Sequence, residues 1–581
     1  MVYNKRMTAL ALAGLMGAMT LAPASPAQAA IAGAWTKING IYQMVDGTSI
    51  DGVVCRGIDV SRWQNTIDWN AVAADDVQFV MLGTKSSGAV DPFFHANAQG
   101  AHAAGVKLGA YIYSYATTVD MAIEEADFVL DLIKDYPISY PVAFDVESNA
   151  QSALSPSDLS TVINAFCQRI EEAGYHPMVY ANDYWLANKI DLSQINYDIW
   201  VARYEKKHNF STPAMWQATS TGSINGINGN VDINFLYKDY SNVIPANTWR
   251  TIGGRTYYYK DYAMQKDAWI NDGNGWYYMN SEGAPSKGWL EKGDSYYYLD
   301  SDTGKMVTGW KQIDSKWYFL SESGAMATGW VQDGGSRYYM NGDGTMATGW
   351  ISQDNHKYYL GGNGAMATGW KQIDGKWYHM DENGVMGTGW IQDGDSKYYL
   401  YNDGAMATGW VDYDGKAYYL ADNGVMAVGW KQLDDAWYYF NGDGSKATGW
   451  ISPDGSWYYL NNEGKMQNGW FTDNTGTYYL SGTSGKMTVG WRQIDDGWYY
   501  FNGSGQQQKG MVNVDGNSYY LDPANGRMAV STSITVDGVN YTVNENGICQ
   551  VVVPETAAEG NPEAPAETPA ETQAPKGPGE M

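Results

Sequence analysis

The feature that most limits the fold of this chain is a tryptophan that recurs about every twenty residues through its second half. The series runs Trp269, Trp289, Trp310, Trp330, Trp350, Trp370, Trp390, Trp410, Trp430, Trp450, Trp470 and Trp491. Repeats this short cannot each bury an apolar face, so they must stack on one another. An array that exposes so many aromatic side chains favours a binding role. We therefore look for catalytic residues in the first half of the chain.

Each repeat has the pattern of a β-hairpin. A Gly-Trp pair opens a strand, an Asp/Gly/Asn/Ser cluster turns the chain, and a Tyr-Tyr-Leu-like strand returns. We therefore predict a β-hairpin solenoid over residues 249–530, with a terminal hairpin at 531–553 as its cap. The Pro/Glu/Ala-rich segment 554–581 has the composition of a disordered tail and carries no cell-wall sorting signal, so we expect non-covalent attachment.

The first residues predict export. Residues 1–29 combine a basic start at Lys5 and Arg6, an apolar run from Thr8 to Leu21, and a small-x-small site at Ala27-Gln28-Ala29. That run is too short to span a bilayer comfortably, and no other segment is apolar enough. We expect a secreted protein without a membrane span.

Charge and cysteine content exclude several classes. The formal net charge of −27 argues against nucleic acid as a partner, because phosphate binding needs clustered Lys and Arg. Three cysteines are too few for a disulfide framework; Cys55 and Cys167 either pair or stay isolated thiols. No Cys/His cluster has metal-ligand spacing, so we expect neither a metal nor another cofactor.

The first half has the alternating pattern of an α/β fold. After a short leader at 30–53, strand-like and helix-like segments alternate over 54–240, which predicts a (β/α) barrel. We expect helices at 68–74, 94–104, 119–136 and 156–173, the last with Ser155 as its N-cap and Pro156 as its first residue. The last crossovers, near 205–214 and 219–230, are too short and too rich in Gly and Asn for helices. We therefore expect an irregular barrel, either closed or incompletely closed.

Four acidic residues fall at the ends of predicted barrel strands. Asp145 and Glu147 end the apolar run that starts at Tyr140, and residues two apart on a strand share one face. Asp59 ends the first strand and Asp232 lies in the last, which are neighbours in a barrel. Such a carboxyl cluster suits glycoside hydrolysis, because crowding keeps one acid protonated as a proton donor. The alternative is that these acids are solvated or cap the following helices.

Aromatic side chains near the same strand ends could stack on sugar rings. The candidates are Trp63, Tyr111, Tyr113, Tyr180, Trp200 and Trp216. Core packing is the alternative for each, and we expect it for about half of them.

The first half resembles glycoside hydrolase family 25, the Chalaropsis-type muramidases. The matching segments follow in order: 57–64, 109–111, 144–147, 180–182, 200–204, 216–217 and 231–234. The resemblance implies hydrolysis of the β-1,4 bond between N-acetylmuramic acid and N-acetylglucosamine in peptidoglycan. It also implies Glu147 as general acid, with Asp145, Asp59 and Asp232 completing the catalytic cluster, and Arg203 among the substrate-binding residues. One departure is the segment 83–88, where the family tends to have a Lys-x-Thr-x-Gly pattern.

The repeats resemble choline-binding, or cell-wall-binding, repeats. A Trp, a second aromatic and a Tyr from the next unit form walls that suit a quaternary ammonium group, each wall contributing about 0.5 to 2 kcal/mol. The ligand implied is choline on teichoic or lipoteichoic acid, while similar repeats of other proteins hold carbohydrate. A purely structural stack is the third possibility.

The repeats differ in a sixty-residue pattern. A Lys/Arg-Gln-Ile/Leu-Asp segment and a second tryptophan follow Trp310, Trp370, Trp430 and Trp491. Most units between them replace the second tryptophan with Arg337, Lys357, Lys397, Ala417 or Thr477, and Trp457 is the exception. We expect the strong choline sites along the edge of the stack that carries these four units, and weak or structural junctions elsewhere. The predicted choline-binding residues are Trp310, Trp317, Tyr339, Trp370, Trp377, Tyr399, Trp430, Trp437, Tyr459, Trp491 and Trp498.

Two functions are compatible with these patterns. The first is a secreted muramidase that the repeats hold non-covalently on a Gram-positive cell wall. The second is a non-catalytic surface adhesin with a degenerate barrel, whose repeats bind choline or glycan. The presence of acids at all four strand positions favours the enzyme.

Overall fold

The computed structural model describes residues 35–86, 88–204 and 206–553. The chain divides into two compact units, Met1–Ala327 and Thr328–Met581. The first contains a β/α barrel and the first hairpins, and the second contains hairpins alone. The predicted signal peptide and tail lie outside the described residues.

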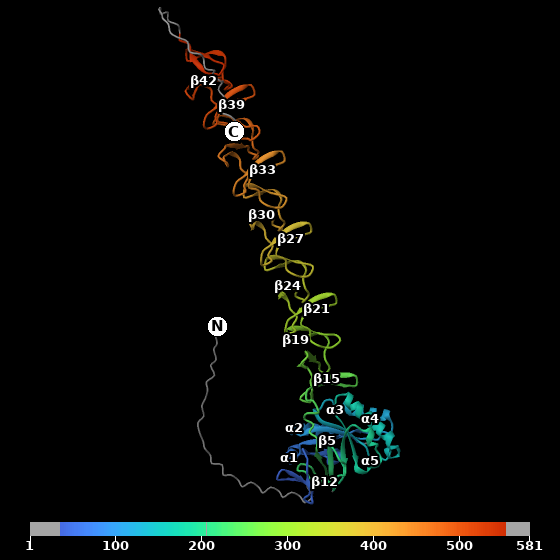
Figure 1. Cartoon of the computed structure of the whole chain (residues 1–581). Coiled ribbons are helices and arrows are strands. Elements are labelled where there is room, and N and C mark those ends of the chain that lie inside the picture. The colour runs from blue at the N-terminus through green and yellow to red at the C-terminus, as the bar shows by residue number, and fades with distance from the viewer. Residues whose placement is uncertain (1–34, 87, 205, 554–581) are drawn as a thin grey trace, which may run out of the picture. The chain divides into compact units, whose positions relative to one another are not determined.

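Eight strands form a closed barrel, surrounded by helices (Figure 1). Closure settles the question that the sequence left open. The strands follow in the order β4 (Cys55–Val60), β5 (Phe79–Gly83), β8 (Lys107–Tyr113), β9 (Ile138–Asp145), β10 (Pro177–Asn182), β11 (Asp198–Ala202), β12 (Met215–Gly222) and β13 (Val231–Leu236).

The barrel is irregular at its last strand. β4 to β12 pair in parallel, whereas β13 runs antiparallel to both β12 and β4. The described residues between β11 and β13 form no helix, as the short crossovers predicted. A direct return from β12 reverses the chain, which explains the antiparallel direction of β13.

The helices lie where the sequence placed most of them. They are α1 (Trp69–Ala74), α2 (Phe94–Ala103), α3 (Val119–Ile133), α4 (Pro156–Glu172) and α5 (Asp183–Asn188), with short 3-10 turns η1 (Arg62–Gln64), η2 (Gln151–Ala153) and η3 (Leu192–Gln194). Helix α4 begins as expected, because the Ser155 side chain accepts from the Asp158 amide and a proline follows. The short helix α5 was not predicted.

Alternate strand residues build two layers of the core. On β5, Phe79 and Met81 pack with Trp200 inside the barrel, whereas Val80 and Leu82 pack in the layer shared with the helices. A Cβ added at Gly57 would lie 2.4 Å from the Phe79 ring, so only glycine allows this ring to cross the strand beside Asp59.

The part of the predicted leader that the structure describes, residues 35–53, is an ordered part of the first unit. Strands β1 (Thr36–Ile38), β2 (Ile41–Gln43) and β3 (Ser49–Ile50) form a small sheet. Trp35 is 1% exposed and meets Trp216 edge to face at 5.9 Å between ring centroids. The segment therefore covers the outside of β12.

The first hairpin after the barrel packs onto it through Arg250. Its strands are β14 (Thr248–Ile252), β15 (Arg255–Lys260) and β16 (Ala263–Met264). The Arg250 guanidinium lies 4.0 Å from the Tyr175 ring centroid and 4.4 Å from that of Tyr259. The Tyr259 hydroxyl donates to the carbonyl of Lys134, just past α3, at 2.9 Å.

The remaining hairpins have the predicted design, each with two antiparallel strands. In the first unit they are β17 (Ala268–Asn271) with β18 (Trp276–Met279), β19 (Gly288–Lys292) with β20 (Ser295–Leu299), and β21 (Gly309–Ile313) with β22 (Lys316–Leu320). The turns are tight, since Asp314 and Ser315 both have positive φ (48° and 65°), as in a type I′ hairpin.

The second unit continues the same series. Its hairpins are β23 (Gly329–Asp333) with β24 (Ser336–Met340), β25 (Gly349–Gln353) with β26 (His356–Leu360), β27 (Gly369–Ile373) with β28 (Lys376–Met380), β29 (Gly389–Asp393) with β30 (Ser396–Leu400), β31 (Gly409–Tyr413) with β32 (Lys416–Leu420), β33 (Gly429–Leu433) with β34 (Ala436–Phe440), β35 (Gly449–Ile451) with β36 (Tyr458–Leu460), β37 (Gly469–Thr472) with β38 (Thr477–Leu480), β39 (Gly490–Ile494) with β40 (Gly497–Phe501), and β41 (Gly510–Val514) with β42 (Asn517–Leu521). The last element has three strands rather than the predicted two: β43 (Thr532–Val536), β44 (Val539–Val543) and β45 (Cys549–Val551).

Two further sequence questions are settled by the structure. Cys55, Cys167 and Cys549 are all free and buried, so Cys55 and Cys167 do not pair. Within the part of the chain that the structure describes, no helix is both long and apolar enough to cross a membrane.

Candidate active site and aromatic boxes

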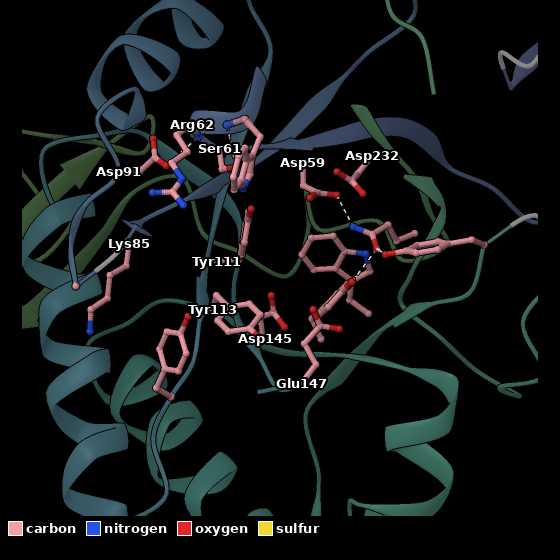
Figure 2. Close-up of a pocket in the computed structure, with 17 residues that line it drawn as sticks. Asp59, Ser61, Arg62, Lys85, Asp91, Tyr111, Tyr113, Asp145, Glu147 and Asp232 are labelled. Carbon is pink, nitrogen blue, oxygen red and sulfur yellow. Dashed lines mark hydrogen bonds between the residues drawn. The ribbon is translucent and has the colours of Figure 1, made fainter. Parts of the chain in front are cut away.

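The four predicted acids line one cavity of about 420 Å³ in the barrel (Figure 2). Asp59 lies on β4, Asp145 ends β9 with Glu147 two residues later, and Asp232 lies on β13. Asp59 and Asp232 are direct partners in the antiparallel pairing of β4 with β13. The strand that closes the barrel therefore brings Asp232 to Asp59.

Two amide side chains hold Asp59. The Gln217 and Asn234 amides each donate to Asp59 Oδ2 at 2.8 Å. Behind them, Trp200 Nε1 donates to Asn234 Oδ1 at 2.8 Å, while the hydroxyls of Tyr180 and Tyr204 donate to Gln217 Oε1 at 2.8 and 2.9 Å. Because their oxygens are engaged as acceptors, both amides must present N–H groups to Asp59.

Burial raises the pKa of the whole acidic cluster. It raises the pKa of Asp232, to which the neighbouring Asp59 adds, and it also raises the pKa of Asp59. The hydrogen bonds from Asn234 and Gln217 act against the rise at Asp59. Of this pair, Asp59 is therefore the carboxyl that ionises more readily.

The other two acids are also shifted upward. Burial, followed by the charges of Glu147 and Asp59, raises the pKa of Asp145 well above its ordinary value. Asp145 Oδ1 is buried without a hydrogen-bond partner, which favours its neutral form. Burial raises the pKa of Glu147 too, with a hydrogen bond to Asn182 acting in the opposite direction. A carboxyl of this kind can hold a proton at a pH where a solvated one has lost it.

Five of the predicted sugar-binding aromatics line the same cavity: Trp63, Tyr111, Tyr113, Tyr180 and Trp200, of which Tyr180 and Trp200 are buried and also belong to the barrel core. Trp63 is 73% exposed, and the Arg62 guanidinium lies 4.7 Å from the centroid of its ring. Burial and the nearby Glu147 raise the pKa of Tyr113 to about 12, so its hydroxyl stays a donor at neutral pH.

Two predicted substrate-binding residues lie outside the cavity. Trp216 is fully buried in the core, and its Nε1 donates to the carbonyl of Arg203 at 2.9 Å. Arg203 itself pairs with Asp183, with Nη1 3.1 Å from Oδ2. A fully buried core tryptophan cannot stack on a sugar, so the prediction for Trp216 is wrong.

Other residues that line the cavity had no predicted role. They include Ser61, Arg62, Lys85, Asp91, Tyr115, Tyr204 and Gln217. Gln217 follows Trp216 on β12, and neighbours on a strand face opposite sides. Recognising Trp216 as a core residue would have placed Gln217 in the cavity. Figure 2 shows Lys85 and Arg62 on the side of the site away from Asp232.

The aromatic boxes of the second unit combine residues of neighbouring repeats. Trp370, Trp377, Tyr398 and Met406 line a cavity of about 370 Å³. The Met406 amide donates to the carbonyl of Trp377 at 2.8 Å, which fixes the methionine at the box. The same arrangement recurs at Trp430, where the Trp437 ring stands at 80° with a centroid distance of 6.4 Å.

The tyrosine wall is the first member of each Tyr-Tyr pair, not the second. Tyr398 contacts Trp370 at 4.7 Å between centroids, whereas Tyr399 contacts Trp390 of its own hairpin. Tyr458 contacts Trp430, and the predicted Tyr459 instead lies against Trp450 and Phe471. Likewise Tyr339 lies against Trp330. The predicted box roles of Tyr399 and Tyr459 are therefore wrong, because adjacent strand residues face opposite sides.

Comparison with known proteins supports the family resemblance of each half of the chain. Residues 58–227 match glycosyl hydrolases family 25. Segments from 307 to 533 match the choline-binding repeat, and residues 267–284 and 287–306 match the putative cell wall binding repeat.

Individual proteins match each half. YegX of Escherichia coli strain K12 is 30% identical over 191 residues, which cover 31% of this chain and 68% of the relative. Lysozyme M1 of Streptomyces globisporus is 28% identical over 196 residues, with 31% and 66% covered. The structure of CbpJ from Streptococcus pneumoniae TIGR4 aligns with 46% of this chain and 100% of its own at 29% identity, with a TM-score of 0.34. The chain therefore belongs to glycosyl hydrolase family 25, as a glycoside hydrolase that acts on peptidoglycan and carries an array of choline-binding repeats.

Proposed function

We propose that the protein is a secreted muramidase, which cleaves the β-1,4 bond between N-acetylmuramic acid and N-acetylglucosamine. The observation that carries the proposal is the gathering of Glu147, Asp145, Asp59 and Asp232 in one aromatic-walled cavity. Buried, crowded carboxyls separate into proton donors and charged stabilisers, as glycoside hydrolysis requires. The similarity to Lysozyme M1 supports the same bond.

In this proposal Glu147 gives its proton to the bridging oxygen of the scissile bond. Its raised pKa keeps it protonated, and cleavage leaves it as a carboxylate; water then adds to the anomeric carbon and gives up a proton, which completes the hydrolysis. Asp59 stays ionised because Gln217 and Asn234 donate to it, and its charge stabilises the oxocarbenium-like transition state. Asp145 lines the same cavity and interacts electrostatically with both Glu147 and Asp59, and its raised pKa favours its neutral form.

The array holds the enzyme on the wall in the same proposal. Each box presents ring faces to the quaternary ammonium of choline on teichoic or lipoteichoic acid. Asp422 also lines the Trp370 box, and a carboxylate there favours a cation over a neutral sugar. Several weak sites on one chain raise the local enzyme concentration without needing one strong site.

The catalytic assignment is tested by zymography on purified wall with Glu147→Gln. Wild-type clearing and at least a hundredfold loss in the variant are expected, since general acid catalysis contributes about 10² to 10⁴. Glu171→Gln, an exposed acid on α4, is the matched control and should clear like wild type. Equal clearing by Glu147→Gln would overturn the assignment. No clearing by wild type would favour the adhesin.

The bond is identified from the released reducing ends. Borohydride reduction followed by sugar analysis should give muramitol, whereas glucosaminitol would place the cut at the other glycosidic bond.

The box is tested by choline titration of Tyr398→Ala and Tyr399→Ala. Only the first removes a wall from the Trp370 box, so it alone should lose a site at that box.

A further inference from the structure

The junctions between repeats are of two kinds. Where a second tryptophan is present, two rings form an open corner, as at Trp430 and Trp437 or at Trp450 and Trp457, with centroids 6.4 and 6.5 Å apart. The space between such walls is what a ligand cation would fill. In the Trp370 box this space is about 370 Å³.

Three junctions that lack the second tryptophan instead hold a cation of the chain itself. The Arg337 guanidinium lies 4.6 Å from the Trp330 ring centroid, and Lys397 Nζ lies 5.2 Å from that of Trp390. Lys446 Nζ lies 5.5 Å from the Trp410 centroid. All three distances are within the range of cation–π attraction.

These cations reach the ring from two different sequence positions. Arg337 and Lys397 occupy the place of the second tryptophan. Lys446 occupies the methionine position of the repeat, since its amide donates to the carbonyl of Ala417 at 2.8 Å, as Met406 does to Trp377. Two unrelated sequence positions thus place a positive charge within cation–π distance of the first tryptophan of a repeat, which indicates a role for the charge rather than for the side chain's position.

Lys357 provides the contrast. It also replaces a second tryptophan, yet it lines an open cavity of about 230 Å³ with Trp350, Tyr378, Met386 and Asp403. A basic residue in the repeat therefore does not by itself close a junction. Closure requires that the charged end lies over the tryptophan ring.

We infer that the charged groups of Arg337, Lys397 and Lys446 take the position that the ammonium group of choline would occupy at Trp330, Trp390 and Trp410. These junctions therefore do not bind choline. The inference rests on the proposed choline binding of the array. A tethered occupant loses no translational freedom on binding and acts at an effective concentration on the order of millimolar or more. A weakly binding free cation cannot displace it. The array would thus contain two kinds of junction: those that bind choline, and those in which a side chain of the protein supplies the cation.

The test counts choline sites per full-length chain by equilibrium dialysis. Lys446→Met restores the methionine found at this position in other repeats, so the repeat should still fold. This variant should bind one additional choline, with the weak affinity expected of a junction that lacks the second tryptophan. Lys397→Met should also add one, because the neutral side chain no longer competes with choline for the Trp390 ring.

Two matched variants control for charge. Lys446→Arg keeps a cation over Trp410 and should add no site. Lys416→Met removes one positive charge from the hairpin that carries Trp410, where Lys416 pairs with Asp443 at 3.1 Å, and should add none either. Near-UV circular dichroism confirms that each variant keeps its aromatic packing.

The outcomes distinguish a failure of this inference from a failure of the proposed choline binding. Choline binding by wild type with no added site in either methionine variant would overturn the inference and leave the proposed function standing. An added site in Lys416→Met would also overturn it, because net charge would then be the cause. No choline binding by wild type would remove the proposed role of the array, and the inference with it.

Discussion

Asp59 on β4 and Asp232 on β13 are direct partners across the antiparallel seam that closes the barrel. Two amides donate to Asp59, whereas burial and the charge of Asp59 favour the protonated form of Asp232. The seam thus brings together one charged and one neutral carboxyl in a confined site. The pH behaviour of the enzyme follows from this asymmetry and from Glu147.

The alkaline limb of the activity profile should report Glu147. A general acid must be protonated, so kcat/KM should fall as the pH rises through its pKa, which burial places above the ordinary 4.5. A pH profile of kcat/KM on soluble peptidoglycan fragments measures it. An alkaline limb at or below 4.5 would contradict the assignment of Glu147 as the acid.

The acidic limb should report Asp59. Gln217→Met removes an N–H donor from the charged form, so the pKa of Asp59 should rise and the acidic limb should move upward by about one pH unit. A hydrogen bond to a charged group contributes roughly 1.5 kcal/mol, and one pKa unit corresponds to about 1.4 kcal/mol. The control is Gln194→Met, an amide that bonds Ser157 and Asp191 outside the cavity. A lower rate without a shift of the acidic limb would show that Gln217 maintains the structure of the site but does not set the pKa of Asp59.

Asp145→Asn should stabilise the protein at neutral pH. Because the pKa of Asp145 is raised by folding, its contribution to stability is complete below 3.8 and is lost as the pH rises through the folded value. At pH 7 the variant, which cannot ionise, should be more stable by about 1 to 3 kcal/mol, the cost of a poorly solvated buried group. Below pH 3.8 this electrostatic advantage should vanish. Denaturant unfolding at both pH values measures it, and a less stable variant at pH 7 would contradict the prediction.

Trp63 and Trp216 should behave in opposite ways. Trp63→Ala removes an exposed wall, so KM should rise about five- to thirtyfold, for a stacking contact of roughly 1 to 2 kcal/mol, with little change in stability. Trp216→Ala opens a cavity beside Trp35 and should lower the free energy of unfolding by about 3 to 5 kcal/mol. Steady-state kinetics and thermal unfolding separate the two. A destabilised Trp63→Ala with unchanged KM would refute the substrate contact.

The hydrolase domain should need the hairpin that follows it. Arg250 is 1% exposed between Tyr175 and Tyr259, so Arg250→Ala loses two cation–π contacts and should destabilise the barrel by about 2 to 4 kcal/mol. A chain ending at residue 266 should unfold at a higher temperature than one ending at residue 246. Arg255→Ala, whose side chain is exposed in the same hairpin, is the control. Equal melting temperatures for the two truncations would contradict this docking.

The repeats, the barrel and the positions of the four acids could all be predicted from the residues alone. These depend on local periods: a hairpin every twenty residues, apolar strand runs, and carboxyls where those runs end. The Ser155-Pro156 helix start is equally local, which is why it was predicted correctly.

Which side chains meet, by contrast, could not be predicted in this way. The pairing of Asp59 with Asp232 depends on the antiparallel entry of β13, and the burial of Trp216 depends on a leader that covers β12 from outside. The choice of Tyr398 over Tyr399 depends on which face of a hairpin meets the preceding repeat. Register and facing are set by contacts between distant segments, and a single sequence records such contacts only through periodicity, which is the same for either face.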